Sequence, residues 1–362
     1  MTNALCYIGT QAEGPGDGIV AAHLDEETGR LTLLGCVAEE ERPTFTLPDA
    51  NRPLLFAVSE VGNRDDRHGA IMSYRILDQS GTLAPIGRRR TGGGPTHLTQ
   101  DANGRMLYCA NFGGPEAVAV PVGSDGLLAP ISAVQITEGT GPHKRQTKPH
   151  PHGVTLDPSG RFLLVPDMGA DRLYTYHVDG TDLTPTNPPY LALPSGCGPR
   201  YVLFGADTRS VYLVGELSAE VFQLSWDGTG IMDVVATTKM DPPDANHVPG
   251  AAAFGLSSDG RHLYVSNRGS HEIHVYALDQ ETGAMQEIQR IEAGGEKPWG
   301  LGFSPSGRWM LVANQASDTV VTYAVDAKTG VLRPGCASIS VRMPTSVSFV
   351  PATVQENLPA AY

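Results

Sequence analysis

Four ionisable residues in this sequence are of the kinds that could carry out acid–base chemistry on a small anion. They are His152 in KPHPHGV, Arg200 in GCGPRY, Glu216 in LVGELS and Arg268 in VSNRGS. A histidine and a carboxylate can exchange protons near neutral pH. Guanidinium groups stay charged and bind carboxylates or phosphates through two parallel hydrogen bonds. The four side chains can act together only if the elements that carry them bring them to one place.

Each of these side chains flanks a motif that recurs along the chain. The motif is a short strand, a four-residue turn that ends before an arginine, and a second apolar strand. Its copies are GPTHLTQDANGRMLYCANF (94–112), HPHGVTLDPSGRFLLVPDM (150–168), CGPRYVLFGADTRSVYLVGEL (197–217), GAAAFGLSSDGRHLYVSNR (250–268) and KPWGLGFSPSGRWMLVANQ (297–315), preceded by the more degenerate PTFTLPDANRPLLFAVSEV. The turn arginines follow one another at intervals of 53, 56, 48, 52 and 47 residues. Such a period is typical of a four-stranded propeller blade.

The two ends of the chain supply a seventh copy. ALCYIGTQAEGPGDGIVAAHL, near the N-terminus, has the pattern of a blade's second and third strands, and MPTSVSFVP (343–351) has the pattern of a first strand. Joining them closes the ring and removes exposed sheet edges. We therefore predict an all-β protein, a seven-bladed β-propeller of four-stranded blades that forms a single domain over residues 1–362. Its first blade combines about 1–35 with 340–351, and 352–362 form a C-terminal tail.

The geometry of a blade predicts where the chemical side chains lie. The first two strands are antiparallel, so the first begins and the second ends on the same face of the propeller, at the mouth of the central channel. At first-strand starts stand His97, His150, His152, Arg200 and Trp299, and at second-strand ends stand Glu60, Asn111, Phe112, Asp167, Glu216, Arg268 and Asn314. Residues that vary over a regular frame are typical of a functional site. We predict catalytic roles for His152, Glu216, Arg200 and Arg268, and substrate-binding roles for His97, His150, Trp299 and Asn111.

The charge balance limits the classes of partner. Lys and Arg total 26 against 39 Asp and Glu, a formal charge of −13. This acidity disfavours nucleic acid and anionic membranes as partners, whereas a local cluster of arginines can still bind a small anion. Five scattered cysteines and an N-terminus without the pattern of a secretory leader favour a reducing, cytoplasmic location. The oligomeric state is left open.

The segments that carry the chemical residues resemble one protein family. Together, HPHGVTLDPSGRFLLVPD, GPRYVLF, VYLVGELS, LYVSNRG and KPWGLGFSPSGRWMLVANQ are similar to the lactonase family of seven-bladed β-propellers. That family includes bacterial 6-phosphogluconolactonases and the fungal carboxy-cis,cis-muconate lactonizing enzyme. The resemblance extends from YIGT at 7–10 to the strand near 350, and only GADTR and PDAN depart from the pattern. It implies a His, an Arg, a Glu and a second Arg at one mouth, which fall on His152, Arg200, Glu216 and Arg268.

The resemblance implies a lactone hydrolase that acts on a small anionic sugar lactone such as 6-phosphogluconolactone, without a metal or other cofactor. His152 and Glu216 would share the proton transfers, and Arg200 and Arg268 would hold the anion and the developing oxyanion. The same residues could instead run a cycloisomerisation of the carboxymuconate type, in which a carboxylate adds to an alkene. A propeller that binds a ligand without catalysis is the third alternative.

Two weaker hypotheses concern other residues near the same mouth. His143, His150 and His152 could ligate a metal, because alternate strand residues point to one side, but no further ligand at the family's spacing accompanies them. Cys197 in SGCGPR could be a nucleophile, but no partner that would activate its thiol is apparent.

Overall fold

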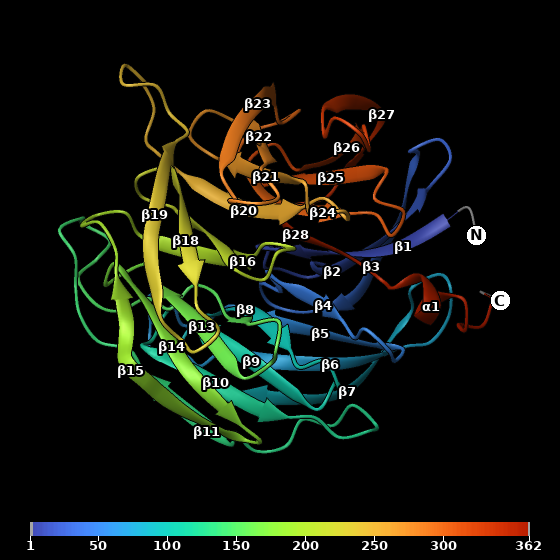
Figure 1. Cartoon of the computed structure of the whole chain (residues 1–362). Coiled ribbons are helices and arrows are strands. Elements are labelled where there is room, and N and C mark those ends of the chain that lie inside the picture. Colours follow the sequence, from blue (N-terminus) through green and yellow to red (C-terminus); the bar gives the residue numbers. More distant parts are fainter. Residues whose placement is uncertain (1–2, 361–362) are drawn as a thin grey trace.

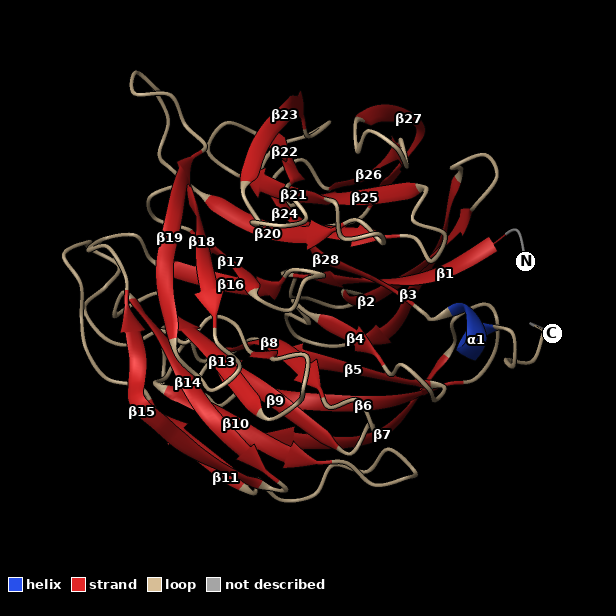
Figure 2. Ribbon diagram, viewed as in Figure 1, coloured by secondary structure: helices blue, strands red, loops and turns tan. Residues whose placement is uncertain are grey.

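The chain forms a ring of seven four-stranded antiparallel sheets (Figures 1 and 2). This arrangement is seen in a computed structural model that describes residues 3–360, apart from the side chain of Cys336. The first strand of each sheet lies nearest the centre of the ring and the fourth lies at its outside. The predicted all-β, seven-bladed propeller of four-stranded blades is therefore confirmed.

The blades are numbered along the chain, and their strands run from the centre outward. Blade 1 contains β28 (Pro344–Phe349), β1 (Asn3–Thr10), β2 (Gly18–Asp25) and β3 (Leu31–Glu39); blade 2 contains β4 (Thr46–Pro48), β5 (Leu54–Ser59), β6 (Ala70–Ile76) and β7 (Leu83–Arg90). Blade 3 contains β8 (Pro95–Gln100), β9 (Met106–Asn111), β10 (Glu116–Pro121) and β11 (Ala133–Ile136); blade 4 contains β12 (Thr155–Leu156), β13 (Phe162–Asp167), β14 (Arg172–Asp179) and β15 (Asp182–Ala192). Blade 5 contains β16 (Pro199–Phe204), β17 (Ser210–Gly215), β18 (Glu220–Trp226) and β19 (Met232–Lys239); blade 6 contains β20 (Ala251–Leu256), β21 (His262–Asn267), β22 (Glu272–Leu278) and β23 (Met285–Glu292). Blade 7 contains β24 (Pro298–Phe303), β25 (Trp309–Asn314), β26 (Thr319–Val325) and β27 (Leu332–Ser340), and the helix α1 (Ala352–Gln355) follows β28. Within residues 3–360, no helix is long and apolar enough to cross a membrane.

Apolar side chains fill the space between neighbouring blades. The second strands are buried on both faces, and β5, β13 and β17 are buried at every residue. Along β1, Leu5 and Tyr7 pack against blade 2, whereas Cys6 and Ile8 pack against blade 7. This alternation fixes the register, because a slip by one residue would move each side chain to the wrong interface.

In blades 2 to 5, an aspartate holds the turn between the first two strands. In blade 4, Asp157 accepts a hydrogen bond from the Phe162 N–H group at 2.8 Å, and Gly160 has a left-handed φ of +69° that glycine adopts without steric cost. The divergent turn GADTR of blade 5 places Thr208 at a φ of +57° instead. Asp207 still accepts hydrogen bonds from two N–H groups beyond it, so this turn forms without its glycine.

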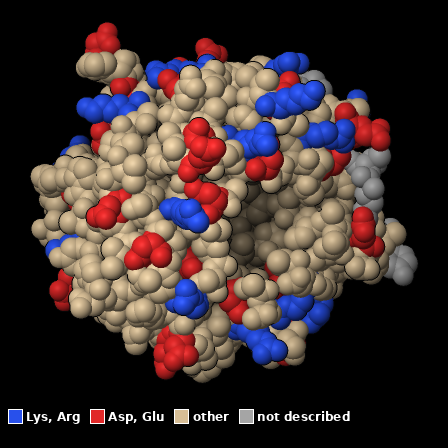
Figure 3. Space-filling model, viewed as in Figure 1, with Lys and Arg blue, Asp and Glu red and all other residues tan. Residues whose placement is uncertain are grey.

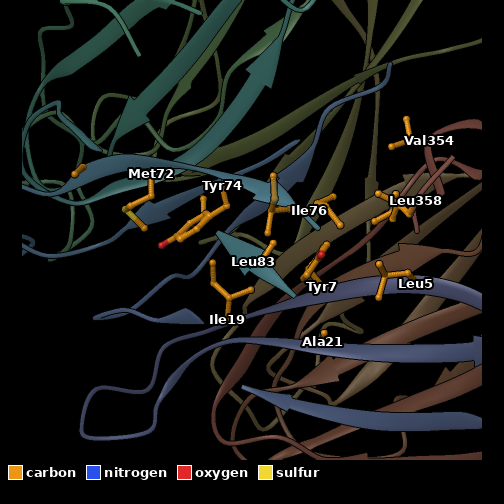
Figure 4. Packing of buried hydrophobic residues seen from close by; sticks show 14 residues of the cluster. Leu5, Tyr7, Ile19, Ala21, Met72, Tyr74, Ile76, Leu83, Val354 and Leu358 are labelled. Atoms are coloured by element: carbon orange, nitrogen blue, oxygen red, sulfur yellow. The ribbon is translucent and has the colours of Figure 1, made fainter. Parts of the chain in front are cut away.

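The two ends of the chain share blade 1, as predicted. Strand β28 pairs antiparallel with β1, with Phe349 opposite Cys6. The expected C-terminal tail is different: Val354 and Leu358 pack into the cluster that contains Leu5 (Figure 4). The side chain of Gln355 also accepts a hydrogen bond from the Leu5 N–H group at 2.9 Å. Val354 and Leu358 are four positions apart, so they give the segment after the last strand an apolar face, which packs against the end of blade 1.

Truncation of the chain after Arg342 is expected to cause aggregation, because it removes β28 and α1 and leaves one edge of β1 without a partner. Size-exclusion chromatography and thermal unfolding check this result. A truncated protein that elutes and melts like the full chain would contradict closure of the ring by the two ends.

The first strand of blade 4 is shorter than predicted. Strand β12 contains only Thr155–Leu156, and the preceding segment is joined to β13 by an isolated bridge between Pro151 and Asp167. The His152 N–H group donates to the Pro166 carbonyl at 2.9 Å. Prolines on both sides remove ladder donors, so the histidines of this segment lie on irregular extended chain.

Candidate active site

One hydrogen bond, repeated in all seven blades, builds the frame of the channel mouth. The residue that follows the second strand donates its N–H group to a carbonyl just before the first strand, over 2.7 to 3.0 Å. The donor–acceptor pairs are Gln11–Met343, Glu60–Arg42, Phe112–Gly94, Met168–His150, Glu216–Gly198, Arg268–Gly250 and Gln315–Lys297. The backbone is thus regular where the side chains vary.

This frame defines two rings of side chains. The donors form the second-strand ring: Gln11, Glu60, Phe112, Met168, Glu216, Arg268 and Gln315. The residues two positions after the acceptors form the first-strand ring: Thr44, Thr96, His152, Arg200, Ala252, Trp299 and Thr345. All four residues predicted to be catalytic belong to these rings. Figure 3 shows the molecular surface hollowed near the centre of the propeller, around which the first strands are arranged.

Glu216 is the centre of the site. Its carboxylate is buried, and Oε1 lies 2.6 Å from Arg145 Nη1 and 2.9 Å from Arg268 Nη2. Oε2 accepts a hydrogen bond from Arg200 Nη1 and lies 3.8 Å from His152 Nε2. The structure therefore brings together His152, Arg200, Glu216 and Arg268.

His152 is uncharged in this arrangement. Its Nε2 lies within hydrogen-bond distance of Arg200 Nη1, and a guanidinium group can only donate, so Nε2 is the acceptor and the proton is on Nδ1. Burial and the charge of Arg200 lower the pKa of His152 well below its usual value, against the opposing effect of Glu216. Nδ1 is buried and has no hydrogen-bond partner in the described structure.

The charges of the cluster stabilise the ionised form of Glu216. Burial by itself would raise its pKa, but Arg268, Arg200 and Arg145 together hold that pKa well below the usual range. Burial lowers the pKa of Arg268 to about 10, although Glu216 opposes this shift, so the guanidinium remains charged at neutral pH. Glu216 is thus a permanent anion that orders three cations, and it is a weak base in this state.

The residues predicted to bind substrate lie beside the cluster, with one exception. Trp299 is covered by Arg268, whose guanidinium carbon lies 4.3 Å from the ring centroid. His150 stacks on Phe112 at 4.6 Å, and its Nδ1 lies 2.6 Å from the Phe112 carbonyl oxygen. His97 lies between aromatic rings, 4.8 Å from that of Tyr201, and burial followed by Arg200 lowers its pKa to about 3.

Asn111 is the exception. It is the last residue of β9 and is fully buried, and its amide bonds to the Thr91 hydroxyl at 2.8 Å and to the Glu116 carbonyl at 3.2 Å. The same position holds the buried Asp167 in blade 4 and Asn267 in blade 6. This position therefore belongs to the repeated frame, and the variable position is the next one along the chain.

Arg145 and Tyr201 also belong to the site, although sequence reasoning missed both. Arg145 lies between β11 and β12 in GPHKRQTKPH, outside the repeated motif, so the alignment of copies gives it no position. Its location in a run rich in basic residues is a weak signal, because another such run, Arg88 to Arg90, lies elsewhere in the chain. The Tyr201 ring lies 5.2 Å from that of His152 and 4.8 Å from the Arg200 guanidinium carbon.

The metal and thiol hypotheses gain no support from the geometry. Among residues 3–360, no group of three His, Cys, Asp or Glu side chains could hold a metal ion. His143 Nδ1 accepts a hydrogen bond from the Arg145 N–H group at 3.2 Å. Cys197 is buried, and burial followed by the charge of Asp171 raises the pKa of its thiol, so a thiolate nucleophile is disfavoured.

Asp171 connects the two segments that carry arginines of the site. Its Oδ1 accepts hydrogen bonds from Gln146 Nε2 at 2.7 Å and from the Gly198 N–H group at 2.8 Å. Gln146 directly follows Arg145, and Gly198 lies two residues before Arg200. One buried carboxylate therefore positions both guanidinium groups on Glu216.

Replacement of Asp171 with alanine is expected to lower kcat/KM about a hundredfold, because small displacements of positioned groups cost that much. Asp318→Ala is the matched control: Asp318 has a φ of +54° in blade 7, against +53° for Asp171, and bonds the Met343 N–H group at 2.8 Å. Both variants should melt at lower temperatures, and only Asp171→Ala should lose activity. Asp171→Asn, which keeps one acceptor, should recover part of it; equal activity losses in the two alanine variants would contradict a positioning role.

Comparisons with known proteins agree with the seven-bladed fold. The family model described as "Lactonase, 7-bladed beta-propeller" matches residues 5–349. The 6-phosphogluconolactonase of Bacillus subtilis is 30% identical over 301 residues, 82% of this chain and 84% of that protein. A solved structure, the periplasmic gluconolactonase of Pseudomonas aeruginosa, is 32% identical with a TM-score of 0.90, and the match covers 96% of this chain and 99% of that one. The chain therefore belongs to the lactonase family of seven-bladed β-propellers.

Proposed function

We propose that this chain hydrolyses a small anionic sugar lactone, such as 6-phosphogluconolactone, at the mouth defined by the two rings. The observation that carries the proposal is a buried Glu216 carboxylate, held by three guanidinium groups, beside an uncharged His152. The names of relatives support the reaction class, because the similar proteins from B. subtilis and P. aeruginosa are named 6-phosphogluconolactonase and gluconolactonase.

The charge of the site favours an anionic substrate. Arg145, Arg200 and Arg268 bring three positive charges against the one negative charge of Glu216, which leaves a net charge of +2 from 3 − 1. This surplus lies in a chain with a formal charge of −13. A substrate phosphate or carboxylate can use the guanidinium donors that Glu216 leaves free, since each guanidinium carries five N–H groups.

His152 is suited to remove a proton from the attacking water. When the substrate engages Arg200, the His152 Nε2 lone pair becomes available to water, which then adds to the lactone carbonyl. The imidazolium that forms lies beside the Glu216 carboxylate, with Nε2 and Oε2 3.8 Å apart in the present arrangement. The guanidinium groups stabilise the oxyanion, because fixed charges in a desolvated site need no reorganisation. Glu216 thus assists the base electrostatically and keeps its own negative charge throughout.

Product analysis in oxygen-labelled water tests the proposal. The purified protein is incubated separately with 6-phosphogluconolactone, gluconolactone and carboxymuconate. We expect the phosphorylated lactone to open fastest, with one labelled oxygen in the product carboxylate. Lactone formed from carboxymuconate without label would indicate the cycloisomerase instead, and tight binding without turnover would indicate a binding propeller.

We also propose that the reaction needs no metal ion, because arginines supply the positive charges at the site. Incubation with EDTA followed by an assay should leave the initial rate unchanged. A rate that falls with EDTA and returns with calcium or zinc would overturn this and favour the histidine cluster as a metal site.

A further inference from the structure

A second carboxyl group lies at the mouth, on the opposite side from Glu216. Glu60 occupies in blade 2 the position that Glu216 occupies in blade 5: each follows a second strand and donates its N–H group to the repeated carbonyl, at 2.9 Å and 2.8 Å. Blades 2 and 5 are three blades apart in a ring of seven, the largest separation that the ring allows. The two carboxyl groups therefore face the mouth from opposite sides.

The surroundings of the two carboxyl groups differ in kind. Glu60 Oε2 accepts hydrogen bonds from the hydroxyls of Thr44 at 2.5 Å and Thr96 at 3.4 Å, both members of the first-strand ring. Oε1 accepts from Asn63 Nδ2 at 2.6 Å. Hydroxyl and amide groups can donate to a carboxylate and accept from a protonated carboxyl group, whereas the guanidinium groups around Glu216 can only donate and carry positive charge, which favours the ionised form.

We propose that Glu60 is the general acid that protonates the leaving ring oxygen of the lactone. The inference rests on the proposed hydrolysis, for which His152 is the base and the arginines hold the anion. It gives the two sides of the mouth separate tasks: the side formed by blades 4 to 6 binds charge and activates water, and the side formed by blade 2 supplies a proton to the departing oxygen.

The proton inventory of the step balances. Water loses a proton to His152 Nε2 as its oxygen bonds to the carbonyl carbon. The bond between that carbon and the ring oxygen then breaks, its electron pair goes to the ring oxygen, and that oxygen takes the proton of Glu60. His152 returns its proton through solvent to the Glu60 carboxylate. The net change is the addition of one water across the acyl–oxygen bond.

The charged and titratable groups around Glu60 are compatible with this role. Burial raises the pKa of Glu60, and the hydrogen bonds of Thr44 and Asn63, followed by the charges of Arg42 and Arg200, only partly offset it. His97, beside this side of the mouth, has a pKa of about 3 and is neutral, and burial raises the pKa of Tyr201, which is neutral as well. Carboxyl groups of one site with pKa values moved in opposite directions are typical of a donor and a permanent anion.

Asn63 provides a partner for both forms of Glu60. Its Nδ2 bonds to the carboxylate, whereas its Oδ1 is buried and has no hydrogen-bond partner in the described structure. A half-turn of the amide would present Oδ1 to the O–H group of the protonated acid. The carboxyl proton would then be held by a bond until the leaving oxygen takes it.

The test is the pH profile of Glu60→Gln against that of the wild type. A general acid must be protonated, so wild-type kcat should fall as the pH rises through the pKa of Glu60. The variant should lose about a hundred- to ten-thousandfold in kcat, with KM little changed, and should lack this descending limb because an amide does not titrate. Glu60→Asp keeps a carboxyl group and should keep the limb at a reduced rate.

Glu26→Gln is the matched control. Glu26 is also a buried carboxyl with hydroxyl partners, with Oε2 3.1 Å from Ser304 Oγ, but it lies beside a turn of blade 7 at the other end of the propeller. This variant should match the wild type in kcat and pH profile. An active wild type with an unaffected Glu60→Gln, or a slow Glu60→Gln that keeps the limb, would overturn the inference alone. A wild type that opens no lactone would overturn the proposed function and the inference with it.

Discussion

Replacement of Glu216 with glutamine is expected to lower kcat by about a hundred- to ten-thousandfold, the range that acid–base assistance contributes. The amide keeps the shape of the carboxylate but cannot stabilise the imidazolium of His152 or order three guanidinium groups. Initial rates on a phosphorylated lactone measure the effect. His152→Ala should cause a similar loss, and the double variant should be far less than additive, because the two residues act as one unit.

The same substitution should also change stability in a pH-dependent way. Loss of the buried anion leaves the arginines without their partner, which costs about 3 kcal/mol in comparable cases. Since the pKa of Glu216 is lowered from 4.5 in the folded protein, its stabilising contribution is complete above pH 4.5 and is lost as the pH falls through the folded-state pKa. The free energies of unfolding of wild type and Glu216→Gln should therefore converge below that pH. Near-normal kcat in a folded Glu216→Gln protein would remove Glu216 from the chemistry.

Replacement of Arg268 with alanine is expected to raise KM for the phosphorylated lactone about ten- to a hundredfold. This increase corresponds to the loss of the binding free energy of one or two hydrogen bonds to a charged group. Arg268 is held over Trp299 and by Glu216, so its fork is preorganised toward the mouth. Arg268→Lys should recover little, because an ammonium group cannot bind an anion bidentately. Steady-state kinetics on phosphorylated and unphosphorylated gluconolactone measure the preference, which should shrink in both variants.

Arg290 of the same blade is the matched control for Arg268. It lies on β23, is partly exposed and pairs with Glu287 at 3.0 Å. Arg290→Ala should leave kcat, KM and the preference for the phosphorylated lactone unchanged. An Arg268→Ala protein that loses equal activity toward both lactones would show that this arginine does not bind the phosphate.

The propeller frame could be predicted because its determinants are local and repeated. An aspartate or a serine that holds the turn between the first two strands, and a second strand buried on both faces, recur from copy to copy. Closure of the ring explains the incomplete patterns at the two ends. The irregular segment around His152 could not be predicted in the same way, because it depends on the bridge between Pro151 and Asp167 and on the hydrogen bond from His152 to the Pro166 carbonyl of the neighbouring strand. The packing of Val354 and Leu358 depends likewise on surfaces built by the other end of the chain.

The site residues that occupy repeated positions of the blades could be predicted from the sequence. Comparison of the copies leads to Glu216 and Arg268, which share one position of the repeat, and the same comparison would have separated Asn111 from them, since its position holds Asn or Asp in several blades. Arg145 lies on a connection between blades, where no repeat fixes the direction of a side chain. Its contact with Glu216 depends on the buried Gln146 and Asp171, and such long-range hydrogen bonds leave no local pattern in the sequence.

The most direct test of the account is the initial rate of acid release from 6-phosphogluconolactone at constant pH, with the spontaneous rate subtracted. We predict saturable, EDTA-resistant hydrolysis by the wild type, and a rate close to the spontaneous one for the His152→Ala/Glu216→Gln double variant. No release above the spontaneous rate by folded wild-type protein, or equal rates for the wild type and the double variant, would contradict lactone hydrolysis at this mouth.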